Sequence, residues 1–209
     1  MLFSDAAILL ILAFAVQDDS LDGKELSVEI RNGNQQAFRT FYDRHYPGLY
    51  RFMVSRGMSH DEAADLVQNA FVMIWERRSD IDEKKSLRAF LFQIAYSRML
   101  NHISYQSRFA GEVPPAAQTG EINEIDETDS EKDLHYGELL SRVRKIIAAM
   151  PEKRAMVFEL CFMKQFTYKE TAEALGVSQK TVENHMTLAF RNLRLELVKM
   201  YGDELPGNE

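Results

Sequence analysis

The chain has little of what enzymes and metalloproteins use for chemistry. Its single cysteine, Cys161, excludes an internal disulfide and a thiolate zinc site. Its five histidines show no metal-ligand spacing, and no glycine-rich phosphate loop or nucleophile elbow is present. Cys161 lies among apolar residues on an expected buried helix, which favours a core thiol over a nucleophile. We therefore expect no catalytic residue, no metal, no cofactor and no small-molecule substrate, and hence no enzyme.

Long apolar runs are also scarce. The one run, residues 6–16, would reach about 16 Å as a helix, against about 30 Å for a bilayer core. It lacks the basic leader of a signal peptide, because no Lys or Arg precedes Lys24. We interpret residues 1–24 as an atypical extension foreign to the fold, as a start codon set too early would give. An interfacial anchor is the alternative, and we expect a cytoplasmic protein.

Strand patterns are missing as well, because no alternating segments flank hairpin turns. A length of 209 residues with 45% apolar content suffices for one large or two small cores. We expect an all-α protein with two small helical domains joined by a flexible acidic linker.

The net charge of −7 is distributed unevenly. Residues 31–109 carry twelve basic and eight acidic side chains, and residues 134–200 carry eleven and seven. Residues 110–133 carry one and eight, together with prolines and glycines. Two basic blocks of this kind can meet phosphates although the whole chain is acidic. The acidic segment is expected to be a flexible linker, and a plain tether accounts for it unless a partner offers a positively charged channel.

Residues 167–185 have the pattern of a helix-turn-helix. Thr167 can cap a first helix, Gly176 permits the turn, and Ser178 can cap a second helix. An apolar stripe on the second helix consists of Val182, Met186, Ala189, Leu193 and Leu197. The opposite face carries Lys180, Glu183, Asn184, Thr187, Arg191 and Arg194. Polar groups near the start of such a helix are typical of base reading in the major groove, although an ordinary solvated helix hairpin shows the same amphipathic pattern.

The first basic block predicts three or four helices. Residues 36–56 carry aromatic residues on one side, and Pro47 is expected to bend that helix. Ser59 caps the next helix, whose core stripe is Ala63, Leu66, Val67, Ala70, Phe71, Ile74 and Trp75. Its outward residues are Asp65, Gln68, Asn69, Val72 and Glu76.

A further helix, from Leu87 to about Tyr105, has more aromatic residues than a core requires. Leu87, Leu91, Ile94, Ala95 and Met99 would form the core, while Phe90, Phe92, Tyr96 and Ile103 lie among basic and amide side chains. Such residues suit unstacked bases, because every base has a π-face. Burial of the helix on two sides explains the pattern equally well.

The order of these motifs resembles the extracytoplasmic-function sigma factors of the sigma-70 family. The motifs are Phe-Tyr-Asp-Arg-His-Tyr-Pro-Gly-Leu-Tyr-Arg-Phe at 41–52, Asp-Glu-Ala-Ala-Asp-Leu-Val-Gln-Asn-Ala-Phe-Val-Met-Ile-Trp at 61–75 and Leu-Arg-Ala-Phe-Leu-Phe-Gln-Ile-Ala at 87–95. The acidic linker and the helix-turn-helix follow, so the resemblance covers about residues 30–198. Chain length and linker resemble the versions found in Bacteroidetes.

The resemblance implies domains and partners. Residues 25–109 would be the sigma region-two domain, 110–133 the linker, 134–201 the region-four domain and 202–209 a tail. The partners implied are core RNA polymerase, promoter DNA and an anti-sigma factor. The linker would thread the polymerase cleft, where its carboxylates could mimic RNA.

The resemblance also implies site residues. Binding to core polymerase would fall to Asp65, Gln68, Asn69 and Val72. Melting and holding the −10 element would fall to the loop at 80–85, including Lys84 and Lys85, and to Phe90, Tyr96, Ser97 and Asn101. Many members have Asn where Ser97 stands, so this chain departs from the family in its base pocket. Reading of the −35 element would fall to Thr167, Ser178, Gln179, Lys180, Thr181, Glu183, Asn184, Thr187 and Arg191.

A second function is compatible with the helix-turn-helix. Residues 177–185 also resemble the DNA-binding domain of LuxR-type regulators, which bind duplex DNA as dimers. Such proteins usually carry a receiver or sensing domain in front, and residues 31–109 lack the strands of a receiver. The aromatic helix at 87–105 discriminates between the two functions, since a duplex-only regulator does not need it.

Overall fold

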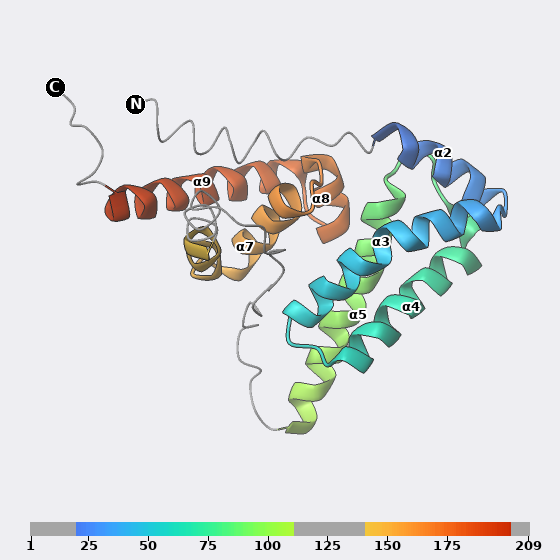
Figure 1. The fold of residues 1–209 in the computed structure, drawn as a ribbon, viewed down its shortest axis with the longest axis horizontal. Helices are drawn as coiled ribbons and strands as arrows, with labels where there is room; N and C mark the ends of the chain where they lie inside the picture. The colour runs from blue at the N-terminus through green and yellow to red at the C-terminus, as the bar shows by residue number, and fades with distance from the viewer. Residues whose placement is uncertain (1–19, 111–140, 202–209) are drawn as a thin grey trace, which may run out of the picture. The chain divides into compact units, whose positions relative to one another are not determined.

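The computed structural model describes residues 20–110 and 141–201 (Figure 1). Within these ranges the chain forms helices and turns and no strand, so the all-α prediction is confirmed. The apolar run at 6–16, the linker residues 111–133 and the tail at 202–209 lie outside the described residues. Contacts between Cα atoms divide the described chain into two compact units, residues 20–110 with 169–177, and residues 141–168 with 178–201.

The first unit is built mainly from a bundle of four helices, α2 (Ser20–Arg31), α3 (Gln35–Ser55), α4 (His60–Glu76) and α5 (Leu87–Ala110). A short 3₁₀ turn, η1 (Arg78–Asp80), follows α4. Helix α3 packs against α2 and α4, and α5 packs against α4 (Figure 1). Helix α2 begins before residue 25 and buries Ile30 completely.

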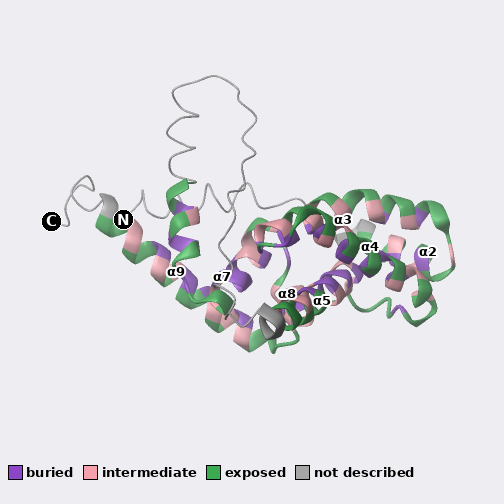
Figure 2. Cartoon of the chain, turned by 90° about the horizontal axis from the view of Figure 1, so that it is seen from below, coloured by how far each residue is buried: buried purple, intermediate pink, exposed green. Residues whose placement is uncertain are grey.

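The core of this bundle contains a cluster of aromatic rings. The Phe71 ring lies 6.3 Å from Phe38, 5.8 Å from Phe41 and 4.7 Å from Tyr42, measured between ring centroids. Toward α5, the Phe52 ring lies 4.9 Å from Phe92. Buried residues lie on the inner sides of α3, α4 and α5, and exposed residues lie on the outer sides (Figure 2). Burial of these rings stabilises the bundle together with buried aliphatic side chains such as Val67 and Ile74.

Local capping fixes where the helices of the bundle begin. Asn34 accepts hydrogen bonds from the N–H groups of Gln36 and Ala37 at the start of α3. Ser59 accepts from the N–H of Glu62 at the start of α4, which confirms the cap predicted there. Pro47 lies inside α3, which runs unbroken from Gln35 to Ser55.

The second unit contains helical residues 141–148, α7 (Glu152–Phe158), a π-helical turn η2 (Glu159–Met163) and α9 (Gln179–Tyr201). Helix α7 packs against α9, and the Phe158 ring lies 5.8 Å from Phe190. Cys161, which we expected on a buried helix, lies in the π-helical turn and is half-buried. The wider turn makes side chains point in different directions from those in an α-helix, because its hydrogen bonds span five residues instead of four.

Candidate functional site

Helix α4 carries an exposed polar stripe. Gln68 and Asn69 lie three and four residues after Asp65, and Val72 lies four and three residues after them, so all four share one face of the helix. All four are exposed, and Val72 has 50% of its surface accessible. The opposite face is the buried stripe predicted from the sequence, except that Trp75 is half-buried. The structure thus brings these four predicted residues together.

Trp75 anchors the end of α4. Its ring centroid lies 5.0 Å from that of Phe38. The guanidinium of Arg78 lies 4.6 Å from the centroid of the Trp75 ring. Nη1 of Arg78 also donates a hydrogen bond to the carbonyl of Trp75 at 2.8 Å. These contacts support the interpretation of Trp75 as a structural anchor.

The loop before α5 presents two lysines. Lys84 and Lys85 are exposed, and their N–H groups donate to the side chain and the carbonyl of Asp82. Ser86 accepts a hydrogen bond from the N–H of Ala89 at 3.2 Å and so caps α5. Sequence reasoning missed this cap, although a serine just before an apolar helix is its usual signal.

The aromatic residues of α5 were expected either to bind unstacked bases or to be buried on two sides of the helix, and they divide between these interpretations. Phe92 is buried against Phe52, as expected for a helix packed on two sides. Phe90 and Tyr96 are half-buried, and the Tyr96 ring stacks on Phe92 at 5.9 Å. Ser97 and Asn101 are exposed. Ile94, expected in the core, is half-buried. The residues predicted for the −10 element are therefore all at least partly accessible, as are Leu100 and Tyr105, which the sequence did not predict for it.

The turn before α9 has the predicted geometry. Gly176 follows α8 (Tyr168–Leu175) and has φ +65°, which favours glycine. Ser178 accepts a hydrogen bond from the N–H of Thr181 at 3.1 Å and caps α9, as predicted.

Helix α9 separates a buried stripe from a polar face. Val182, Met186, Ala189 and Leu193 are buried, while Leu197 is half-buried. Nζ of Lys180 lies 3.0 Å from the carboxylate of Glu183. The residues predicted to read the −35 element that are exposed are Thr167, Ser178, Gln179, Lys180, Asn184, Thr187 and Arg191, and Thr181 and Glu183 are half-buried.

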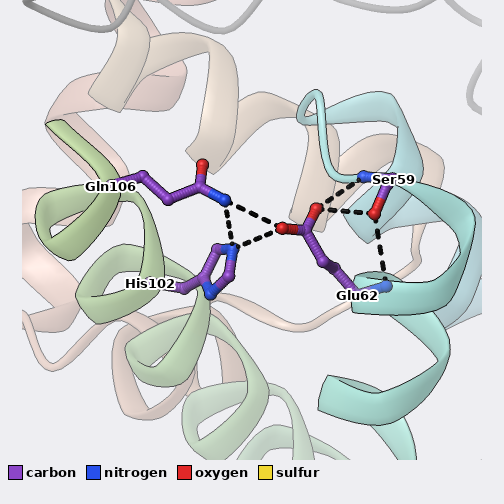
Figure 3. Close-up of polar contacts among 4 residues, drawn as sticks. All are labelled: Ser59, Glu62, His102 and Gln106. Atoms are coloured by element: carbon purple, nitrogen blue, oxygen red, sulfur yellow. Dashed lines mark hydrogen bonds and ion pairs between the residues drawn. The ribbon is translucent and has the colours of Figure 1, made fainter. Parts of the chain in front are cut away.

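Sequence reasoning missed a polar cluster between α4 and α5. We name Ser59, Glu62, His102 and Gln106 the Glu62 cluster (Figure 3). The hydroxyl of Ser59 contributes most to lowering the pKa of Glu62 to about 2, followed by the Ser59 N–H; burial opposes the shift and His102 adds to it. Only the Ser59 part was visible as a local signal, because His102 and Gln106 lie far along the chain.

The lowered pKa of Glu62 predicts a pH dependence of stability. Because the folded pKa is about 2 and the unfolded one about 4.3, the carboxylate stabilises the fold fully above about pH 4.3. This stabilisation is lost as the pH falls through about 2. We expect Glu62→Gln to be less stable than the wild type at pH 7, with a deficit that shrinks between pH 4 and pH 3. Urea unfolding at each pH measures this, and a deficit of equal size at pH 7 and pH 3 would contradict it.

No metal site or membrane span emerges from the described ranges. Residues 20–110 and 141–201 hold no group of three His, Cys, Asp or Glu side chains that could bind a metal ion. None of the helices in these ranges combines the length and apolar content needed to cross a bilayer.

Comparison with known families matches two regions of the chain. Residues 41–109 match the family described as Sigma-70 region 2, and residues 140–193 match Sigma-70, region 4. The RNA polymerase sigma-E factor of Streptomyces coelicolor is 32% identical over 137 residues, covering 66% of this chain and 72% of that protein. The RNA polymerase sigma factor CnrH of Cupriavidus metallidurans is 26% identical over 166 residues, covering 77% and 86%.

Solved structures share the fold. CnrH in complex with the cytosolic domain of CnrY has a TM-score of 0.56 at 23% identity, covering 84% of this chain and 97% of that one. RpoE in complex with the anti-sigma factor NepR, from Bartonella quintana, has a TM-score of 0.58 at 20% identity, covering 78% and 96%.

Two helical regions in this order are the parts of a transcription initiation factor. The chain belongs to the extracytoplasmic-function group of the sigma-70 family of RNA polymerase sigma factors. Its function is therefore that of a sigma factor, which directs core polymerase to promoters. The alternative of a LuxR-type regulator finds no support among these relatives.

Proposed function

We propose that residues 25–109 bind core polymerase and the −10 element, that residues 134–201 read the −35 element, and that residues 110–133 link the two. The observation that carries this division is the pair of exposed polar helix faces. One lies on α4, and the other lies at the start of α9; each lies opposite a stripe of mostly buried residues. The chain performs no chemistry itself in this proposal.

Polymerase docks on the exposed stripe of α4. Asp65 supplies a charge, and Gln68 and Asn69 supply amide groups. Val72 supplies an apolar side chain that gains from being covered by a partner. A rigid, capped helix presents these groups with little loss of conformational entropy on binding.

The −10 element is held by the loop before α5 and by α5 itself. Lys84 and Lys85 contact phosphates, because both are exposed cations. The accessible parts of Phe90 and Tyr96 contact unstacked bases, and Asn101 offers an amide to a base edge. Ser97 has a shorter side chain than the asparagine of many members, so its base contact differs from theirs.

The −35 element is read by the first turns of α9. Asn184 is exposed and its amide can pair with adenine, and Glu183 can accept from cytosine N4. Lys180, now paired with Glu183, can donate to guanine or to a phosphate. Arg191 lies further along the helix and contacts phosphates.

Asn184→Ala is expected to relax selectivity at one position of the −35 element. A bidentate contact from Asn to adenine is worth about 1–3 kcal/mol of discrimination, and the alanine variant loses it. Affinities for −35 sequences substituted at each position, measured with the polymerase holoenzyme, check this. Arg191→Ala is the control, since losing a phosphate contact weakens binding to all sequences alike. Uniform weakening by Asn184→Ala would show that Asn184 contacts only the backbone.

The proposed partners are core RNA polymerase, promoter DNA and an anti-sigma factor. The complex of the related RpoE with NepR supports an anti-sigma partner here. The linker threads the polymerase cleft in this proposal, which its eight acidic side chains support. A cytoplasmic location follows from these partners, and the chain length and linker support a source among the Bacteroidetes.

Transcription in vitro tests the proposed function. Bacterial core polymerase is combined with fragments of the host genome, with and without the full chain. New, specific starts that depend on the chain are expected, and they would provide its −35 and −10 sequences. Polymerase that stays inactive until another sigma factor is added would contradict the proposal.

A further inference from the structure

The Glu62 cluster joins two helices through the two oxygens of one carboxylate (Figure 3). Oε2 of Glu62 accepts from the N–H of Ser59 at 3.0 Å and from its hydroxyl at 2.7 Å. Oε1 accepts from Nε2 of Gln106 at 2.8 Å and lies 2.9 Å from Nε2 of His102. Ser59 and Glu62 belong to the start of α4, and His102 and Gln106 belong to α5.

This arrangement exceeds what a helix cap needs. A capping box uses a Glu at the third helical position to satisfy the N–H of the capping residue, and Oε2 does so here. The second oxygen, Oε1, contacts His102 and Gln106 on α5. Gln106 Nε2 also lies 2.9 Å from His102 Nε2, so the tautomer of His102 decides whether its Nε2 donates to Glu62 or accepts from Gln106. In both tautomers Gln106 donates to Glu62, and α4 stays tied to α5.

The tie lies where apolar packing of α5 ends. Met99 is 3% exposed and is the last buried residue of this helix before residue 107. From residue 100 to residue 106 every side chain is exposed or half-buried. The position of this part of α5 therefore depends strongly on polar contacts, and the Glu62 cluster supplies them from α4.

Both helices carry proposed interface residues next to the cluster. Asp65 lies one turn after Glu62 on α4, at the start of the stripe proposed to bind polymerase. Asn101, proposed to contact the −10 element, directly precedes His102 on α5. The cluster thus ties the helix that carries the proposed polymerase stripe to the helix that carries Asn101.

We infer that Glu62 is a positioning residue, which fixes the second half of α5 against α4 through His102 and Gln106. This inference rests on the proposed function of the two helices. Polymerase that holds α4 then also fixes Asn101 at a constant place relative to the promoter. Melting of the −10 element requires that capture of bases compensates for lost base pairing, and a loosely held α5 captures them less well.

The test compares three variants of the full chain with the wild type. His102→Ala/Gln106→Ala removes the α5 side of the cluster and keeps the cap of α4. Ser59→Ala is the matched control, because it weakens the cap and keeps the contacts to α5. His102→Gln is the conservative variant, since an amide N–H can reach Oε1 of Glu62.

The measured quantity is the rate of open-complex formation by the polymerase holoenzyme. Each variant is assayed on a promoter found by the transcription assay, both as a duplex and as a template with mismatched, premelted −10 bases. We expect the double variant to open the duplex promoter about tenfold more slowly, equivalent to about 1.4 kcal/mol in the barrier. On the premelted template its rate is expected to differ from the wild-type rate by less than about twofold. Ser59→Ala and His102→Gln are expected to stay within about twofold of the wild type on both templates.

Each outcome has one meaning. A selective loss on duplex DNA in the double variant, with rates close to the wild type in His102→Gln, supports the inference. Equal losses on both templates, or a loss in Ser59→Ala as large as in the double variant, would reveal a purely structural role and overturn it. If the double variant does not fold, as circular dichroism will show, Gln106→Ala takes its place with the same criteria. A wild-type chain that initiates on neither template overturns the proposed function instead.

Discussion

Phe71→Ala is expected to lower the free energy of unfolding by about 3–5 kcal/mol, because it removes a large ring from a packed core. Phe71 is 2% exposed, and its ring contacts those of Phe38, Phe41 and Tyr42. The bundle can refill such a cavity only in part, since these three rings are all held by one helix, α3. Urea unfolding followed by circular dichroism measures the loss.

Val72→Ala is the matched control for this prediction. Val72 follows Phe71 on the same helix, and half of its surface is exposed. We expect a change within about 0.5 kcal/mol, as is usual for surface positions. A loss below about 1 kcal/mol for Phe71→Ala would contradict the aromatic core described for α3 and α4.

Asp65→Arg is expected to weaken binding to core polymerase by about 100-fold while the fold keeps its stability. Reversal of a charge inside an interface costs about 2–5 kcal/mol, because the new charge is desolvated against an unfavourable partner. Asp65 is exposed, so the isolated chain tolerates the change. Equilibrium binding of labelled chain to core polymerase measures the affinity.

Asp61→Arg provides the control for charge. It makes the same change one turn earlier on α4, on the same face but before the first residue of the stripe of Asp65, Gln68, Asn69 and Val72. It should leave polymerase affinity within about threefold, although it removes an acid from the first turn and costs about 0.3–1 kcal/mol of stability. Equal weakening by both variants would mean that net charge, and not the stripe, governs binding.

Helix α4 shows what sequence reasoning predicts well. Its cap, its buried stripe and its exposed stripe all depend on residues within one helix, so spacing alone is sufficient. The turn at Gly176 and the cap at Ser178 were predicted for the same reason, since each is a local backbone requirement.

Helix α5 shows where such reasoning stops. The spacing of its apolar and aromatic residues does not separate rings that face the core from rings that face a partner. Burial of Phe92, for example, depends on Phe52 in a different helix. The Glu62 cluster was missed because His102 and Gln106 lie 40 and 44 residues after Glu62 in the sequence. Helix α2 was missed because few of its residues are apolar, and it is held by packing against α3.

The separation of faces on α9 has a consequence for how such proteins diverge. Val182, Met186, Ala189 and Leu193 hold the helix in place, while Lys180, Asn184 and Thr187 are exposed. Substitutions at exposed positions change stability by only about 0.5 kcal/mol or less. On the proposal that this face reads the −35 element, duplicated copies of the chain can acquire new promoter preferences through mutations on one face, and no compensating change is needed in the core.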